Sequence, residues 1–258
     1  MIGNAIAALP MYDWPQVSAS TDRLWSGIRD ALRRRGIAAP DRLTRGADLW
    51  QLWESPDLML AQTCGMPFRT RLHPRVALAG TPDFGLPDCP PGHYNSVFVV
   101  RRGEAGTVAD FAGRTLAYNE AGSQSGWAAP QNHMAAEGLP AFVSTRRTGA
   151  HRLSAQAVAD GTADIAAIDA VTWRFIAAHA PEVAGRLRIA GRTALTPGLP
   201  YVTARAGDAA AIAAAAGEAI AGLPAADRAA LGLQGLVRIP AEAYLAVPTP
   251  PPPAQNAP

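Results

Sequence analysis

The sequence predicts an α/β protein built from two lobes. Short apolar runs alternate with longer segments whose apolar residues recur at helical spacing, a pattern typical of largely parallel sheets covered by helices. The alternation begins near the N-terminus and begins again near Gly103. A chain of 258 residues, 48% of them hydrophobic, is long enough to build two modest cores.

The elements of the first half are predicted from apolar periodicity and from the glycines and prolines that interrupt it. In order, they are a strand over residues 6–11, a helix over 22–35 and strands over 58–62, 75–79 and 96–101. Leu24, Ile28 and Leu32 recur at helical spacing in the helix, and Gly36 ends it. The strand over 96–101 is rich in β-branched residues, which favour strands.

The second half carries the same alternation. Its predicted elements are a short helix over 108–111, a strand over 115–119, a helix from the turn GSQSG to about 137, a strand over 142–145, a helix over 151–160, a strand over 164–168, a helix over 170–178, an extended segment over 187–193, a strand over 201–204 and an Ala-rich helix over 208–223. These elements predict a second α/β unit.

The lobe boundaries follow from where the pattern restarts. The expected first lobe is discontinuous, residues 1–98 with 196–247, and the second lobe is residues 99–195, with crossings near 98–103 and 189–196. Residues 248–258 are dense in proline, so we expect an extended or disordered tail outside the fold.

The charged residues exclude several chemistries. All 23 basic residues are Arg, so neither a Schiff-base lysine nor a phosphate-loop lysine is available. The net charge is only +2, and the one basic run, Arg33 to Arg35, falls near a predicted helix end, where cations are favourable. We interpret it as a solvated helix terminus, because nucleic-acid binding usually needs a broader basic stripe.

No membrane span is expected, because no run of eighteen or more apolar residues occurs. The first ten residues lack a basic segment and a long apolar core, so no secretory signal is visible; either the signal is missing from this sequence or the protein stays inside the cell. Cys64 and Cys89 could close a disulfide, which would fit an extracytoplasmic protein; two buried thiols are the alternative.

The turn after the strand over 115–119 is the strongest candidate site. Ser123, Gln124, Ser125 and Gly126 open a helix, where backbone N–H groups, hydroxyls and the positive end of the helix dipole favour an anion. The turn lacks both the phosphate-loop and the dinucleotide patterns. An ordinary serine N-cap is the alternative explanation.

Two further side chains follow strands or turns of the second unit. Asp169 ends the strand over 164–168, at the sheet edge where open α/β folds place ligands, and helix capping is the alternative role. His151 follows a turn and could donate to an oxyanion, with a merely polar surface residue as the alternative.

The first half offers three more donors. Thr63 follows the buried strand over 58–62, and Tyr12 and Tyr94 carry phenolic hydroxyls. Core packing is an equal alternative for both tyrosines.

Several stretches together resemble one family. They are LPMYDWP at 9–15, QTCG at 62–65, GTPDFG at 80–85, CPPGHYNSVFVV from Cys89, AYNEAGSQSG from Ala117, SAQAVADGTADIAAID from Ser154 and TPGLPYVT from Thr196. They are similar to the substrate-binding proteins of phosphate, phosphite and phosphonate ABC transporters, over nearly the whole chain up to about Tyr244.

The resemblance implies a type II periplasmic binding-protein fold, with mixed sheets flanked by helices and a ligand cleft between the lobes. It implies a small phosphorus oxyanion as ligand, hinge closure, delivery to a membrane permease, a periplasmic location and a monomer. It places the ligand on the helix start at Ser123, Gln124 and Ser125, with Asp169 accepting a hydrogen bond from a protonated oxygen or an amino group. Less closely, it maps Tyr12, Tyr94 and His151 to ligand donors. Gln124 departs from the family, which often has a hydroxyl residue there, and this puts the ligand's identity in doubt.

Two other functions stay open at this point. A sensor module of the same fold would fit the absence of a visible signal peptide. An enzyme acting on a small phosphorylated or heterocyclic metabolite is disfavoured, because the sequence has no Lys, no HExxH pair and no GxSxG elbow. No cofactor, metal or nucleic-acid partner is expected.

Overall fold

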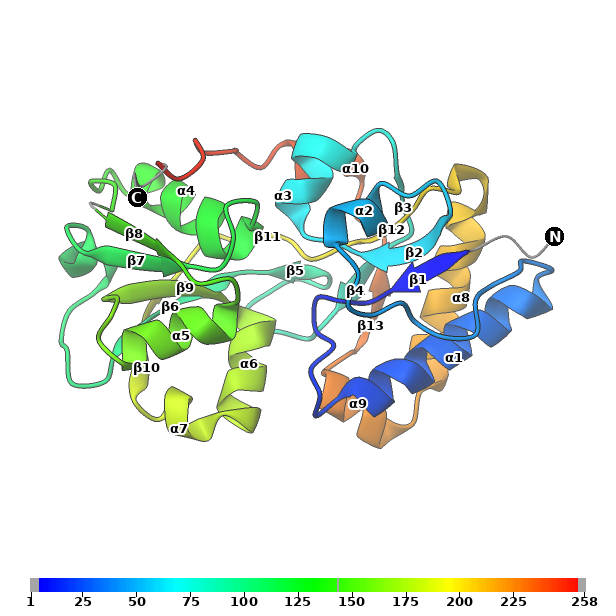
Figure 1. Cartoon of the computed structure of the whole chain (residues 1–258), viewed down its shortest axis with the longest axis horizontal. Helices are drawn as coiled ribbons and strands as arrows, with labels where there is room; N and C mark the ends of the chain where they lie inside the picture. The colour runs from blue at the N-terminus through cyan, green and yellow to red at the C-terminus, as the bar shows by residue number, and fades with distance from the viewer. Residues whose placement is uncertain (1–4, 143, 255–258) are drawn as a thin grey trace. The chain divides into compact units, whose positions relative to one another are not determined.

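The structure, a computed structural model, describes residues 5–142 and 144–254. The predicted elements and tail therefore lie within it except for residue 143 of the strand over 142–145 and residues 255–258 of the tail. The chain divides into two compact units, each described by itself (Figure 1). Unit 1 comprises the described residues up to His93 together with Pro197–Ala246, and unit 2 comprises Tyr94–Thr196 together with the described residues from Val247 onward.

Unit 1 is organised around a four-stranded sheet in the order β1-β2-β12-β3. Its strands are β1 (Ile6–Ala8), β2 (Leu58–Gln62), β3 (Ala77–Leu78) and β12 (Tyr201–Thr203). β1 and β2 are parallel, whereas β12 runs antiparallel to both of its neighbours. A separate antiparallel pair joins β4 (Thr81–Asp83) to β13 (Gly235–Val237).

The helices of unit 1 include two long ones that pack on each other. The set is α1 (Ser18–Arg34), α2 (Leu49–Trp53), α3 (Gly65–Pro67), η1 (Phe68–Leu72), η4 (Ala206–Asp208), α8 (Ala209–Gly222), α9 (Ala225–Leu231) and α10 (Ala241–Leu245). α1 and α8 lie side by side (Figure 1), and a Cβ added at Gly27 would lie 3.1 Å from the Cβ of Ala219. The small side chains therefore allow close contact, and the Ala-rich segment is a packed helix as predicted.

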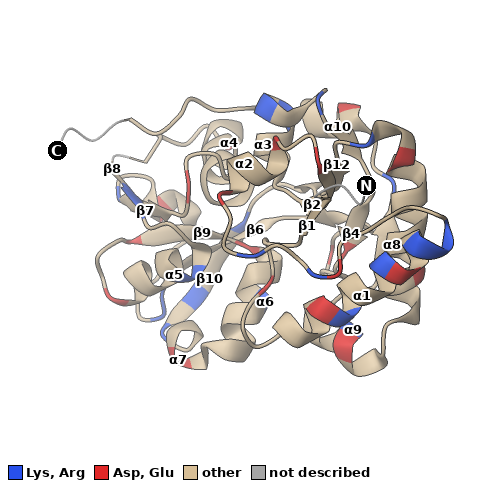
Figure 2. Ribbon diagram, turned by 45° about the vertical axis from the view of Figure 1, so that its right-hand side comes forward, with Lys and Arg blue, Asp and Glu red and all other residues tan. Residues whose placement is uncertain are grey.

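The basic run at the end of α1 is neutralised locally. Arg34 and Arg35 both pair with Glu218 of α8, and Arg33 pairs with Asp41 at 2.8 Å. Figure 2 shows basic and acidic residues interspersed over this part of unit 1. This arrangement agrees with a solvated helix end.

Unit 2 contains a five-stranded sheet in the order β10-β6-β9-β7-β8. Its strands are β6 (Ser96–Arg101), β7 (Thr115–Tyr118), β8 (Ser144–Arg147), β9 (Ile165–Asp169) and β10 (Leu187–Arg192). Its helices are η2 (Val108–Phe111), η3 (Gln124–Ala128), α4 (Ala129–Ala136), α5 (His151–Ala159), α6 (Ala170–His179) and α7 (Pro181–Ala184).

The expectation of largely parallel sheets is correct only for part of this sheet. β7 is parallel to both β8 and β9, because helices α4 and α5 supply the crossover connections that parallel pairing needs. β6 is antiparallel to β9 and β10 is antiparallel to β6. The sheet is therefore mixed.

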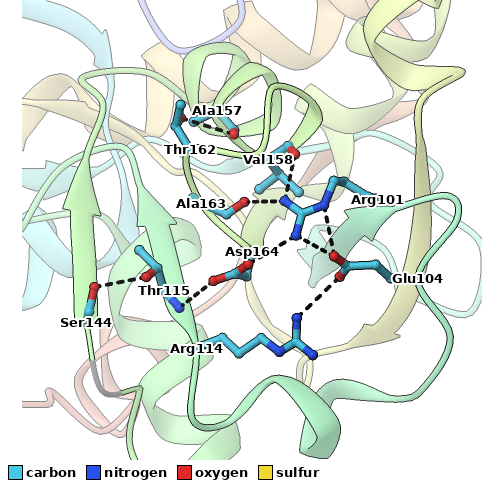
Figure 3. Close-up of polar contacts among 10 residues, drawn as sticks. All are labelled: Arg101, Glu104, Arg114, Thr115, Ser144, Ala157, Val158, Thr162, Ala163 and Asp164. Atoms are coloured by element: carbon cyan, nitrogen blue, oxygen red, sulfur yellow. Dashed lines mark hydrogen bonds and ion pairs between the residues drawn. The ribbon is translucent and has the colours of Figure 1, made fainter.

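A polar network ties together one end of the unit 2 sheet (Figure 3). Arg101 at the end of β6 donates to the carbonyl oxygen of Ala163 at 2.8 Å and to Asp164 at 3.1 Å, and it also pairs with Glu104. The other carboxylate oxygen of Asp164 accepts from the Thr115 amide at 3.1 Å. Burial raises the pKa of Asp164, but the Thr115 amide and the Arg101 guanidinium outweigh it, so the pKa lies below its ordinary value. This network lies where β7 and β9 begin.

The chain passes between the units after His93, after Thr196 and after Ala246. The first two passages pair with each other as a short two-stranded sheet of β5 (His93–Tyr94) and β11 (Thr196–Pro197). Among the described helices no single one is long and apolar enough to cross a membrane; Ala206–Gly222 and Ala225–Leu231 meet that test only when combined across a bend of 113°.

Candidate functional site

The turn between β7 and α4 folds as the short π-helix η3, and Ser123 is its N-cap residue. The Ser123 hydroxyl oxygen accepts a hydrogen bond from the Gly126 amide at 3.0 Å. The Ser123 carbonyl oxygen accepts from the amides of Trp127 and Ala128 at 3.2 and 3.0 Å. Ser123 therefore acts as an N-cap, the role that the sequence offered as the alternative to an anion site, and it organises the first turn of η3.

Ser125 is the centre of the polar contacts in this turn. Its hydroxyl oxygen lies 2.8 Å from Nε2 of His151 and 3.4 Å from the Ser123 hydroxyl, and its carbonyl oxygen accepts from the Ser96 hydroxyl at 2.9 Å. Ser125 is only 3% exposed, and the neighbouring Gln124 is 1% exposed. The structure thus brings the helix start and the first residue of α5 into direct contact.

His151 is neutral at physiological pH. Burial lowers its pKa to about 4, and the Ala167 backbone offsets part of this effect. Nδ1 is buried and makes no hydrogen bond of normal geometry, although the Ala167 carbonyl group is close enough to favour a proton on that nitrogen. With the proton on Nδ1, Nε2 is an acceptor and the Ser125 hydroxyl donates to it.

Gly126 lies where no side chain fits. A Cβ at this position would lie 2.0 Å from Oδ1 of Asn119 and 3.1 Å from Cε1 of His151. Oδ1 of Asn119 is buried and has no hydrogen-bond partner among the described residues. The turn, Asn119 and His151 therefore form one packed cluster with an acceptor that has no partner.

Asn119 is a candidate site residue that the sequence pattern did not single out. An asparagine directly after a strand is a common turn residue, so its identity alone carries no signal of a binding site. In the sequence, only its position close to the GSQSG turn points to a role for Asn119 in binding.

Asp169 caps α6. One of its carboxylate oxygens accepts from the amides of Val171 and Thr172 at 2.7 and 3.0 Å, and Asp169 is 2% exposed. It is paired in register with Ser96, which bonds Ser125. The capping role is therefore present, and β6 connects it to the Ser125 turn.

Two predicted residues of unit 1 follow the parallel strands β1 and β2. Thr63 is fully buried, its amide donates to the Pro200 carbonyl at 3.1 Å, and its hydroxyl has no hydrogen-bond partner among the described residues. Tyr12 packs edge-on against Phe84, with ring centroids 4.9 Å apart, beside a cavity of about 30 Å³. A cavity of this size holds about one water molecule.

Tyr94 belongs to unit 2, and the two cysteines belong to unit 1. Tyr94 is buried on β5, at the first passage between the units. Cys64 caps α3 and Cys89 lies in the loop before β5; both are half-buried thiols and are not joined by a disulfide. The suggested Cys64–Cys89 disulfide is thus not present in the structure.

The described residues contain no group of three or more His, Cys, Asp or Glu side chains that could hold a metal ion. Within unit 2 the site consists of neutral donors and acceptors around Ser123, Ser125, His151 and Asn119, with the Asp169 carboxylate nearby.

Comparison with solved structures shows the fold. PhnD1 from Prochlorococcus marinus, in complex with methylphosphonate, is 13% identical and superposes with a TM-score of 0.70 over 93% of this chain and 94% of that one. XAC2383 from Xanthomonas citri, bound to ATP, is 16% identical with a TM-score of 0.69 over 93% and 92%. A histidine kinase sensor domain with similarity to periplasmic binding proteins is 16% identical with a TM-score of 0.58 over 92% and 98%.

The fold is thus that of type II periplasmic binding proteins, as the resemblance implied. No curated protein gives a significant sequence match. The family model for the periplasmic phosphonate substrate-binding protein of ABC transporters matches residues 60–239, which include every predicted site residue except Tyr12. The chain belongs to this family of phosphonate ABC transporter substrate-binding proteins, which are binding proteins and not enzymes.

Proposed function

We propose that this protein is the solute-binding component of an ABC uptake system that captures a small phosphorus oxyanion at the turn formed by Ser123, Gln124, Ser125 and Gly126. The ligand would be phosphate, phosphite or a phosphonate, and it would be delivered to a membrane permease by a monomer in the periplasm. Family membership supports the class of protein. The contact between Ser125 and His151 at the start of η3 is the observation that supports this particular site.

Neutral donors are sufficient for such a ligand. Hydrogen bonds from N–H and O–H groups to an anion are charge-assisted and about twice as strong as neutral ones, and burial of Ser123 and Ser125 removes competing water. Absence of a lysine therefore does not weaken the proposal.

The Ser125 hydroxyl would have to change partner when a ligand binds. In the neutral state it donates to Nε2 of His151, so a bound oxyanion competes for the same proton. If Nε2 of His151 took up a proton from solvent, both the imidazolium and the Ser125 hydroxyl could donate to the anion. Ligand binding would then be accompanied by proton uptake at a pH near neutrality.

Specificity would come from the acceptors around the turn. Asp169 would repel fully ionised ligands and favour a protonated oxygen or an amino group. The partnerless Oδ1 of Asn119 would act in the same direction. The buried Gln124 amide, with both donor and acceptor capacity, fits a ligand less charged than phosphate.

We include Tyr12, Thr63 and Tyr94 in the proposal as further donors, which closure of the two units as lobes would supply. The buried Thr63 hydroxyl, which lacks a partner among the described residues, supports its inclusion.

Calorimetry with a panel of ligands tests the proposal. Phosphate, phosphite, methylphosphonate and 2-aminoethylphosphonate are titrated into the full chain, with sulfate as the control anion. At least one phosphorus compound should bind more tightly than sulfate. Failure of all four to bind would refute the assignment of a phosphorus oxyanion.

A sensor module is the second candidate, because a histidine kinase sensor domain shares the fold at a TM-score of 0.58. The ligand site would be the same, and only the partner would differ. Co-purification with a permease, as opposed to a signalling kinase, from the native host separates the two.

A further inference from the structure

The proline-rich end of the chain lies on unit 2. Residues 247–254 form no helix or strand, and they group with unit 2 although the preceding helix α10 belongs to unit 1. Figure 1 shows this red end of the chain beside α4. The chain therefore has a third passage between the units, after Ala246.

Side chains of α4 and η3 donate hydrogen bonds to carbonyl groups of the segment. Asn132 of α4 donates from Nδ2 to the Pro248 carbonyl oxygen at 2.9 Å, and Trp127 of η3 donates from Nε1 to the Pro251 carbonyl oxygen at 2.9 Å. A polyproline II helix has three residues per turn, so carbonyl groups three residues apart point to the same side. The two carbonyl groups that accept these bonds are three residues apart, which is the spacing of one polyproline II turn.

The surface has the chemistry expected for a proline-rich ligand. Proline has no N–H, so the backbone of the run from Pro250 to Pro253 can only accept hydrogen bonds, and proline-rich segments are bound by aromatic rings together with N–H donors. Beside the segment lies a cavity of about 520 Å³, and none of the described residues that line it is charged. Trp127 and Phe142 supply aromatic rings, while Gln131 and Asn132 supply amides.

Trp127 also belongs to the oxyanion turn. It is in the same five-residue π-helix as Ser125, its amide donates to the Ser123 carbonyl, and its ring packs on Tyr118 at the end of β7 with centroids 5.0 Å apart. Trp127 is 5% exposed, so its ring cannot move without its neighbours.

We propose that the surface of unit 2 around Trp127, Asn132 and Phe142 is a binding site for a proline-rich segment, that residues 247–254 of this chain are its ligand, and that this docking is coupled to occupancy of the Ser123–Gly126 turn. The docked segment fixes Trp127 and with it the turn, so the turn is ordered before the oxyanion arrives. The coupling rests on the proposed function, whereas the docking does not.

The indole N–H of Trp127 reports docking directly in the full-length protein. Its NMR signal is assigned by its loss in Trp127→Phe, and its exchange with solvent is compared between the native chain and a full-length variant in which Pro250, Pro251, Pro252 and Pro253 are replaced by Gly. The variant keeps every carbonyl group but loses the preference for polyproline II. Faster exchange of the Trp127 indole proton in the variant is expected, and equal exchange would overturn the docking.

Coupling is measured on the same two proteins with methylphosphonate, or with whichever oxyanion of the panel binds best. We expect the glycine variant to bind it about fivefold more weakly, at the lower end of usual coupling strengths. Because linkage is reciprocal, saturating ligand should slow indole exchange in the native chain by a similar factor. Equal affinities would overturn the coupling.

Asn132→Ala removes the donor to the Pro248 carbonyl without changing the Ser123–Gly126 turn. Like the glycine variant, it should speed exchange of the Trp127 indole proton and weaken oxyanion binding. If no oxyanion binds at all, the proposed function fails, while the indole comparison still decides whether the segment docks.

Discussion

The neutral state of His151 in the folded protein should make the ligand-free protein less stable in mild acid. Its pKa is lowered by burial from 6.5 to about 4, so between these values the unfolded chain binds a proton that the folded protein does not. The contribution of His151 to the free energy of unfolding is therefore fully present above pH 6.5 and is lost as the pH falls toward 4. Linkage with these two pKa values gives a loss of about 2 kcal/mol between pH 7 and pH 5.

Urea denaturation at pH 7 and pH 5 measures this loss. Other groups titrate as well, so the quantity to compare is the difference between wild type and His151→Gln. The variant should lose less stability than wild type over this interval, by about 2 kcal/mol. An equal loss in both proteins would refute the burial of a neutral His151, and an NMR titration of its Cε1 proton gives an independent value.

Three other substitutions test the packing around the site and the sheet. Gly126→Ala should destabilise unit 2 by about 1–3 kcal/mol in urea denaturation and should weaken oxyanion binding, because the added Cβ would collide with Asn119. Gly122→Ala is the control: nothing lies within 4 Å of a Cβ there, so neither stability nor binding should change. Asp169→Ala should lower the free energy of unfolding by about 1 kcal/mol, because the α6 cap is lost. Asp169→Asn should keep the stability and change only the preference between 2-aminoethylphosphonate and methylphosphonate in calorimetry. An unchanged preference would mean that Asp169 serves only as a cap. Arg101→Met should destabilise by about 1–3 kcal/mol, because it removes the donor to one carboxylate oxygen of Asp164 and to the carbonyl oxygens of Val158 and Ala163. Thermal melts should show no comparable change for the exposed Arg102→Met.

The regular elements could be predicted from the sequence because their signals are local. Strands over 58–62 and 96–101 and the short helix over 108–111 have the predicted bounds. Strand direction was less accessible, because the alternating pattern is the same whichever way a strand runs. The antiparallel β6 and β10 were therefore not indicated by that pattern, and only the family resemblance implied a mixed sheet.

The candidate site was predictable in position but not in its contacts. A strand followed by a Gly/Ser turn and a helix identifies the sheet edge, whereas the contact of Ser125 with His151, 26 residues away in sequence, depends on the placement of α5. The buried Asn119 and the docked proline-rich segment were missed for a related reason. Composition indicates an extended segment, but it does not show which donors its carbonyl groups meet.

Calorimetric titration of methylphosphonate, or the best-binding oxyanion, into wild type, Ser125→Ala and Ser55→Ala tests the central claim most directly. Ser55 is the control, because its hydroxyl accepts from the Asp57 amide before β2, at the other end of that strand from Thr63. Loss of a buried donor at Ser125 should weaken binding by about 1–3 kcal/mol, roughly 5- to 150-fold, with Ser55→Ala unchanged. Equal affinity of Ser125→Ala and wild type would contradict the assignment of the oxyanion to this turn.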